Sequence, residues 1–166
     1  MTIAQAPYSK ETGPSFLTVG VISDTHGLLR PEAVEALSGV NHILHAGDVG
    51  DPAILDVLSS IAPLTAIRGN VDISGRCSQL PATEMVELGG CHIYVIHAIE
   101  DLDIEPRSAG VAIVIYGHSH KPSYEERSGT LYLNPGSAGP RRFDLPVTVA
   151  RLSIGEGKVD ARIIPL

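Results

Sequence analysis

The 166-residue chain has little of what several protein classes require. It contains no tryptophan, and aromatic residues make up 4% and charged residues 19% of it, whereas 43% is hydrophobic. Disordered chains are rich in charge and poor in apolar residues, so this composition excludes global disorder. The longest apolar runs, such as residues 111–116, are far shorter than the roughly 18 residues of a membrane helix. We therefore expect a folded protein without a membrane span.

Cysteine is also scarce, because only Cys77 and Cys91 occur and they form no C-x-x-C pair. A chain of this size with two cysteines is not a disulfide scaffold, which favours a reducing compartment. Residues 1–15 lack the basic start and the apolar stretch of a signal peptide, and we interpret them as a flexible N-terminal extension. These features predict a cytoplasmic protein whose single domain spans residues 16–166.

Positive charge is in deficit, because 12 basic residues stand against 19 acidic ones and give a net charge of −7. A chain of this charge repels nucleic acid and anionic lipid, so we expect no bulk nucleic-acid binding and no membrane partner. A site that handles phosphate would need positive charge from bound cations. The sequence is compatible with a homo-oligomer, in which the partner is a second copy of the chain.

The first half of the chain alternates strand-like and helix-like segments. Residues 16–22 form a near-continuous apolar run, which is typical of a strand buried on both faces. Pro31 and Asp51-Pro52 each mark the start of a helix, and Gly39 marks the end of the first one. Further strands are predicted at residues 42–45 and 64–67, which gives the order βαβαβ.

Beyond residue 73 the pattern is dominated by strands. Residues 84–88 alternate between polar and apolar side chains, and Gly89-Gly90 joins them to residues 91–96, which predicts a hairpin. The acidic segment 99–110 is predicted as a loop with a short helix, and residues 111–116 as a buried strand. Turn signals predict antiparallel strands at residues 124–127, 130–133, 147–152 and 158–164. The whole pattern predicts two packed sheets with helices outside.

Side chains of metal-ligand type follow five of the predicted strands. They are Asp24, His26, Asp48, Asn70, His97, His118 and His120. In open α/β sheets ligands bind at the carboxyl ends of the strands, so we expect these seven side chains to converge on one rim. Asp24 and His26 are two residues apart, as are His118 and His120, and in extended chain such pairs point the same way, about 6–7 Å apart. Each pair could hold one metal ion or straddle two.

Two metal ions about 3.5–4 Å apart form a clamp that hydrolyses phosphate esters through an activated hydroxide. Asp24 and Asp48 neutralise only part of the charge of two divalent ions, which leaves positive charge for a phosphate. Such ions would supply the charge that this acidic protein lacks. The nitrogen and oxygen donors accept Mn, Fe, Co, Ni or Zn, and availability decides among these metals more than affinity does.

Five short segments stand in order along the chain: Asp24-Thr25-His26, Gly47-Asp48, Gly69-Asn70, His97 and Gly117-His118-Ser119-His120. They resemble the five motifs of the calcineurin-like metallophosphoesterase superfamily. The small size, the sequences around Asp48 and Asn70, and Asn134-Pro135-Gly136-Ser137 are similar to its compact bacterial and archaeal phosphodiesterase branch. The resemblance implies an α/β fold, a four-layer sandwich of two mixed β-sheets flanked by helices.

The resemblance also implies two ligand sets. One metal ion would be held by Asp24, His26, Asp48 and His120. The other would be held by Asp48, Asn70, His97 and His118, so that Asp48 bridges the two. Mn is the metal that the resemblance suggests first, and the nucleophile would be a metal-bound hydroxide that attacks a small phosphoester. The metal-bound hydroxide is the one catalytic group that the resemblance implies, and no side chain is assigned a catalytic role.

Five further residues are candidates for supporting the ligands or for binding phosphate. They are His45, Arg68, Asp72, Asn134 and Arg141. His45 either packs in the core or orients the bridging carboxylate. Arg68 and Arg141 are either solvated or clamp phosphate. Asp72 is a cap or an acceptor near the ligands, and the segment that starts at Asn134 is a turn near the rim.

The sequence departs from the superfamily pattern next to two of the motifs. Many monoesterases of the superfamily carry a His directly after the Gly-Asn, where it protonates the leaving oxygen, but this chain has Val71. The fourth motif often reads His-Gly-His and here reads His97-Ala98-Ile99. We therefore predict a metal-dependent phosphodiesterase. The alternatives are a phosphomonoesterase and a non-catalytic protein-binding scaffold of the same fold, similar to the retromer subunit.

Overall fold

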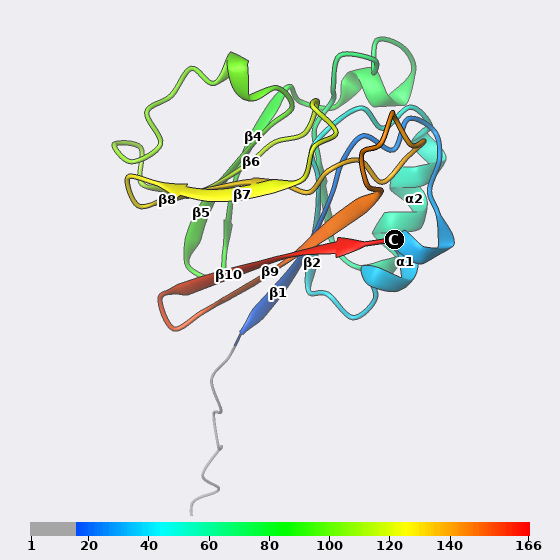
Figure 1. Ribbon diagram of the computed structural model, residues 1–166. Coiled ribbons are helices and arrows are strands. Elements are labelled where there is room, and N and C mark those ends of the chain that lie inside the picture. The colour runs from blue at the N-terminus through cyan, green and yellow to red at the C-terminus, as the bar shows by residue number, and fades with distance from the viewer. Residues whose placement is uncertain (1–15) are drawn as a thin grey trace, which may run out of the picture.

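The computed structural model describes residues 16–166, and the predicted extension over residues 1–15 lies outside this range. Two five-stranded sheets pack against each other (Figure 1). In the first sheet the strand order is β10 (Lys158–Pro165), β9 (Thr148–Gly155), β1 (Leu17–Ile22), β2 (His42–His45) and β3 (Leu64–Ala66). In the second it is β4 (Thr83–Leu88), β5 (Cys91–Ile96), β6 (Val111–Ile115), β8 (Thr130–Asn134) and β7 (Ser123–Arg127).

The βαβαβ order predicted for the first half is confirmed. β1, β2 and β3 run parallel, and helices α1 (Pro31–Ala36) and α2 (Pro52–Ile61) connect them on the outer face of the first sheet (Figure 1). Both helices begin at a proline, as expected, and the Asp51 carboxylate caps α2 by accepting a hydrogen bond of 2.9 Å from the Ala53 N–H. The parallel strands therefore all end at the same edge of the sheet.

The second sheet is mixed. β4 and β5 form the predicted antiparallel hairpin, whereas β5, β6 and β8 run parallel and β7 pairs with β8 in the antiparallel sense. The expectation of antiparallel strands is thus correct for β8 beside β7, and wrong for β8 beside β6. Turn residues between neighbouring segments predict the hairpin, but they carry no information about the strand on the other side. A 3-10 helix, η1 (Arg76–Gln79), also precedes β4 and was not predicted.

Three apolar clusters fill the spaces between the layers. The largest lies between the two sheets and includes Val21, Leu44, Ile93 and Ile113, and a second lies between the first sheet and the two helices. The third covers the outer face of the second sheet with residues of the 99–110 segment, which contains the 3-10 helix η2 (Ile99–Asp101). The predicted α/β sandwich of two mixed sheets is confirmed, and its fourth layer is mostly irregular chain.

Two further expectations concern single features. Cys77 and Cys91 are both free thiols in the structure. Over residues 16–166 no helix has the length and apolar character needed to cross a bilayer.

Replacing Ile113 by alanine should lower the free energy of unfolding by about 2–5 kcal/mol, because its side chain is fully buried between the sheets and the variant leaves a cavity. The matched control is Ile73→Ala, since Ile73 is 83% exposed and the same change there should alter stability by less than about 0.5 kcal/mol. Urea denaturation of both variants measures the difference. Equal losses would contradict the placement of the inter-sheet core.

Candidate metal centre

The seven predicted ligand residues converge on one rim of the molecule. They lie in the loops that follow the carboxyl ends of β1, β2 and β3 in the first sheet and of β5 and β6 in the second. They form two groups, one of Asp24, His26 and His120 and the other built on Asp48, His97 and His118. The convergence predicted from the strand ends is therefore confirmed as geometry, and both sheets contribute to it.

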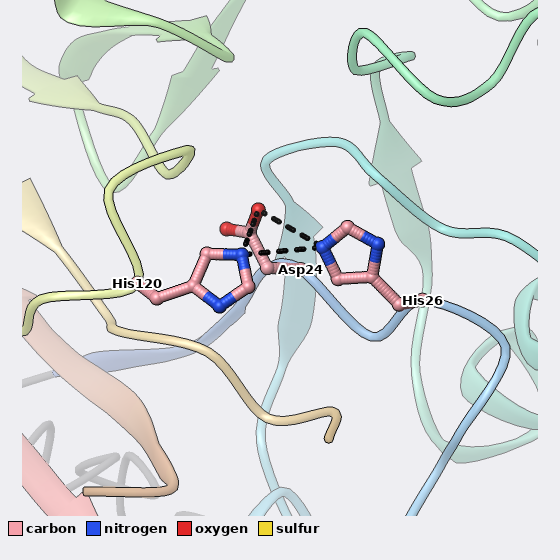
Figure 2. A group of neighbouring side chains, drawn as sticks. All are labelled: Asp24, His26 and His120. Atoms are coloured by element: carbon pink, nitrogen blue, oxygen red, sulfur yellow. Dashed lines mark hydrogen bonds and ion pairs between the residues drawn. The ribbon is translucent and has the colours of Figure 1, made fainter. Parts of the chain in front are cut away.

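In the first group, two imidazole nitrogens face one carboxylate oxygen (Figure 2). The Nε2 atoms of His26 and His120 are 3.2 Å apart, and they lie 3.7 Å and 3.3 Å from Oδ1 of Asp24. Ligand atoms bound at about 2.0–2.2 Å to one tetrahedral cation are separated by roughly 3.3–3.6 Å. The three side chains thus have the spacing of ligands around a common ion.

The second group has a similar spacing. Nε2 of His97 lies 3.2 Å from Oδ2 of Asp48 and 3.0 Å from Oδ1 of Asn70. Nδ1 of His118 lies 3.1 Å from the same Asn70 oxygen. His97 donates through Nδ1 to the Ala46 carbonyl at 2.7 Å, which directs its Nε2 at the group, where it donates to Asp48 when the ring is protonated and is free to bind a metal ion when it is neutral.

Asp48 contacts both groups, because its Oδ2 also lies 3.6 Å from Nε2 of His26. Its other oxygen, Oδ1, accepts a hydrogen bond of 2.9 Å from the Val71 N–H. Burial raises the pKa of Asp48, but the hydrogen bonds from His97 and the Val71 N–H outweigh it, so the pKa lies below its usual range. This carboxylate therefore stays ionised between the two groups, in the position of a bridge.

Asp24 is fully buried, and its two oxygens have different surroundings. Oδ2 accepts hydrogen bonds from the Ser23 hydroxyl at 2.6 Å and the His118 N–H at 3.1 Å, whereas Oδ1 has no hydrogen-bond partner among residues 16–166. Burial raises the pKa of Asp24, and the contacts with His120, His26 and Ser23 lower it by more, so the carboxylate is ionised. A buried, charged oxygen without a donor fits a bound cation, and the N and O donor set suits a divalent transition metal.

The backbone at the ligands is left-handed. Asp24, His26, Asp48, His118 and His120 have φ values between 46° and 69°, so the Asp24/His26 and His118/His120 pairs are not in extended chain, and that expectation is wrong. Non-glycine residues in this region are uncommon and store strain. With this backbone conformation, Asp24 and His26 lie in the same group, whereas His118 and His120 face different groups.

Close packing of backbone against the two carboxylates explains the glycines beside the ligands. A Cβ atom at Gly69 would collide with the carboxylate and the backbone nitrogen of Asp48, and one at Gly117 would collide with the Ser23 hydroxyl and the Asp24 carboxylate. Any side chain at either position would displace a candidate ligand. These glycines let the loops approach each other at the rim.

His45 connects two of the ligand loops from behind. It is fully buried, accepts a hydrogen bond of 3.2 Å from the Gly47 N–H at Nδ1, and so donates from Nε2 to the Thr25 hydroxyl at 3.0 Å. Thr25 in turn donates to the Val49 carbonyl at 2.9 Å. Burial lowers the pKa of His45 to about 4, which keeps the imidazole neutral. The structure thus places His45 behind the ligands, where it fixes both the Asp24–His26 turn and the start of the Asp48 loop.

Asp72 and Asn134 hold other loops at the rim. The buried Asp72 carboxylate accepts hydrogen bonds from the N–H groups of Val49, Gly50 and Gly69, so it joins the loops after β2 and β3. The buried Asn134 amide donates to the Gly117 carbonyl and to the Ser119 hydroxyl, both at 3.0 Å. Each side chain orders a loop that carries candidate ligands.

The two candidate arginines differ in position. Both are exposed, but Arg68 donates to the Leu80 carbonyl at 2.8 Å and borders the second ligand group, whereas Arg141 does not line the cleft beside that group. Sequence reasoning assigned no role to Ser23 or Ser137, whose hydroxyls donate to the side chain and the backbone carbonyl of Asp24. The sequence did contain a signal for Ser23, because it directly precedes Asp24 and its small hydroxyl side chain can donate to that carboxylate.

The comparison with protein families bears on the residues of this rim. The family model for the calcineurin-like phosphoesterase superfamily domain matches residues 17–157, a range that contains all seven candidate ligands. The chain belongs to this superfamily. The resemblance recognised in the five short segments is therefore confirmed, and the sandwich of two mixed sheets is its expected fold.

Curated relatives and solved structures agree with this membership. A probable metallophosphoesterase of Methanocaldococcus jannaschii is 36% identical over 163 residues, covering 90% of this calcineurin-like phosphoesterase and 82% of the relative. A solved structure described as a novel archaeal phosphodiesterase has a TM-score of 0.77 at 25% identity and covers 90% and 100% of the two chains. Vacuolar protein sorting 29 of Cryptosporidium parvum has a TM-score of 0.72 at 20% identity, covers 91% and 98%, and shows the fold alone.

The buried neutral His45 should make the metal-free protein less stable as the pH falls. Between the ordinary histidine pKa of about 6.5 and the folded value of about 4, the unfolded chain binds a proton that the folded chain does not bind. This difference should remove about 3 kcal/mol of stability by pH 4, and stability should rise again with pH. The control is His45→Gln, which should lack this component when both chelated proteins are denatured at pH 7 and pH 4.5. Identical pH dependence of the two proteins would contradict the assignment.

Proposed function

We propose that this calcineurin-like phosphoesterase hydrolyses phosphodiesters with two divalent cations, of which Mn is the first choice. The observation that carries the proposal is the pair of ligand groups that share Asp48, each with the spacing of ligands around one ion. We assign the ligands of the two ions in agreement with these groups. One ion would be held by Asp24, His26, Asp48 and His120, and the other by Asp48, Asn70, His97 and His118. A solved relative described as an archaeal phosphodiesterase supports the choice of ester.

When bound, two such ions would supply a hydroxide nucleophile and positive charge for the phosphoryl oxygens. The protein's own residues prepare the site for them. Asp24 and Asp48 are ionised before any cation arrives, and His45, Asp72 and Asn134 hold the loops so that the ligand atoms need little rearrangement. Such preorganisation means that the site is already shaped for the charge that develops on phosphate.

The side chain after Asn70 favours diesters over monoesters. Val71 is 42% exposed beside the second ligand group, and its N–H is committed to Asp48. A valine cannot donate a proton to a departing alcohol, so esters with a poor leaving group lack assistance at this position. We propose accordingly that the chain acts on small phosphodiesters with no protonating side chain beyond the nucleophile and its ions.

A protein-binding scaffold is the second candidate function, because vacuolar protein sorting 29 has the same fold. A scaffold has no need of converging ionised carboxylates or of left-handed ligand loops, so these features favour the enzyme. The convergence of the ligand-type side chains in two groups that share Asp48 supports the enzyme over the scaffold.

We also propose that residues 16–166 form one domain that acts in the cytoplasm.

Asp48→Asn should reduce both metal content and diester hydrolysis, because the amide removes the charge that faces both groups. We expect more than about a 100-fold loss of kcat/KM, beyond the 10- to 100-fold typical of residues behind the ligands. Elemental analysis and hydrolysis of bis(p-nitrophenyl) phosphate with Mn are the measurements, and Asp160→Asn on exposed β10 is the matched control.

Chelation provides the complementary measurement for the same proposal. Chelated wild-type protein should lose turnover, and saturating Mn should raise its stability by about 2.7 kcal/mol per site at a hundredfold excess over Kd. Full occupancy of both sites in Asp48→Asn would remove Asp48 from the bridging position. A protein stabilised by Mn that hydrolyses no ester would favour the scaffold.

Val71→His should help esters with basic leaving groups more than aryl esters. A correctly placed imidazole supplies up to about 10²-fold through protonation, and the half-exposed position tolerates a larger side chain. The measurement is kcat/KM for a series of diesters with graded leaving-group pKa, at equal metal loading of wild type and variant. We expect a steep dependence in the wild type and a shallower one in the variant. A flat dependence in the wild type would mean that another group supplies the proton.

A further inference from the structure

A cleft of about 680 Å³ opens beside the second ligand group and extends away from it. Asn70, His97 and His118 form its inner end, so a phosphodiester held at this group would direct one of its two substituents into the cleft. These three are the members of the seven candidate ligands that line the cleft. The remainder of the cleft is shaped by the end of β5, the start of β4 and the 99–103 segment.

The floor of the cleft is apolar and carries one free hydroxyl. Tyr94 and Ile96 line it from β5, and both side chains are more than 90% buried. The Tyr94 hydroxyl makes no hydrogen bond with another residue of the described part of the chain, and its oxygen is not among the buried atoms without a partner. It therefore reaches the cleft surface, where it offers an oxygen to a ligand.

The rim of the cleft is acidic. Glu100, Asp101 and Asp103 line it, all three are exposed, and none forms an ion pair within residues 16–166. Arg68 is the one Lys or Arg that lines this cleft, and its guanidinium donates to the Leu80 carbonyl. The outer part of the cleft therefore has three carboxylates against one guanidinium, whereas the inner end is suited to anionic phosphate.

We propose that this cleft binds the alcohol substituent of the diester and selects substituents that carry a positive charge. The proposal rests on the proposed function and names its substrate class, a zwitterionic phosphodiester whose cationic end lies among Glu100, Asp101 and Asp103. A substituent that carries a second phosphate or a carboxylate is repelled there. A zwitterion also avoids the general repulsion of anions by a chain of net charge −7.

Two p-nitrophenyl diesters of equal size test the proposal. Their second alcohols are choline and 3,3-dimethylbutanol, which differ in charge and have nearly the same shape. We expect the Mn-loaded protein to prefer the choline ester by roughly 5-fold or more in kcat/KM at low ionic strength, because exposed charge pairs contribute small factors that multiply. The preference should appear in KM and should shrink at about 0.5 M salt. Calorimetric Kd values for phosphocholine and 3,3-dimethylbutyl phosphate give a second measurement that does not depend on turnover.

The variant carries Glu100→Gln, Asp101→Asn and Asp103→Asn together, and should hydrolyse both esters at similar kcat/KM. Its matched control carries Glu35→Gln, Glu156→Gln and Asp160→Asn, exposed positions outside the cleft with the same change of net charge, and should keep the preference. Equal rates for the two esters in the wild type, or a preference that the control loses as well, would overturn the proposal while leaving the phosphodiesterase intact. Failure to hydrolyse either ester, or the aryl diester above, would overturn the proposed function itself.

Discussion

Two ionised carboxylates in the interior, Asp24 and Asp48, are the constraint on which the rim depends. Burying a carboxylate is costly unless donors or cations surround it. The donors come from separate parts of the chain: Ser23 precedes Asp24, the Val71 N–H follows β3, and His97 and the His118 N–H belong to the second sheet. The site therefore forms only when the two sheets pack, so folding and ligand placement are one event.

The sequence predicted which residues gather within each sheet because the rule behind it is general. Parallel strands end at one edge of their sheet, as β1, β2 and β3 do in the first sheet and β5 and β6 in the second. It predicted the helix starts because a proline or a capping aspartate acts locally. It did not predict the left-handed backbone at Asp24 or His118, since that conformation results from packing between distant loops. The partnership of β6 with β8 and the contact of His45 with Thr25 were missed for the same reason.

The 99–103 segment serves two parts of the structure at once. Ile99 and Leu102 pack on the outer face of the second sheet, while Glu100, Asp101 and Asp103 line the cleft. Because Ile99 and Leu102 are anchored on the sheet, they hold the neighbouring acidic side chains at the cleft. Changes in this segment that preserve Ile99 and Leu102 can alter the charge of the cleft without exposing the core.

The left-handed conformation of five candidate ligands has a consequence for how such a site changes over generations. Glycine adopts this conformation without the steric penalty of a Cβ atom, so replacing a histidine ligand by glycine relieves backbone strain. A lineage released from metal binding would recover that strain energy on losing a histidine ligand, whereas losing Asp24 or Asp48 would leave buried hydrogen-bond donors without an acceptor. The histidines of such a site are therefore easier to lose than its two carboxylates.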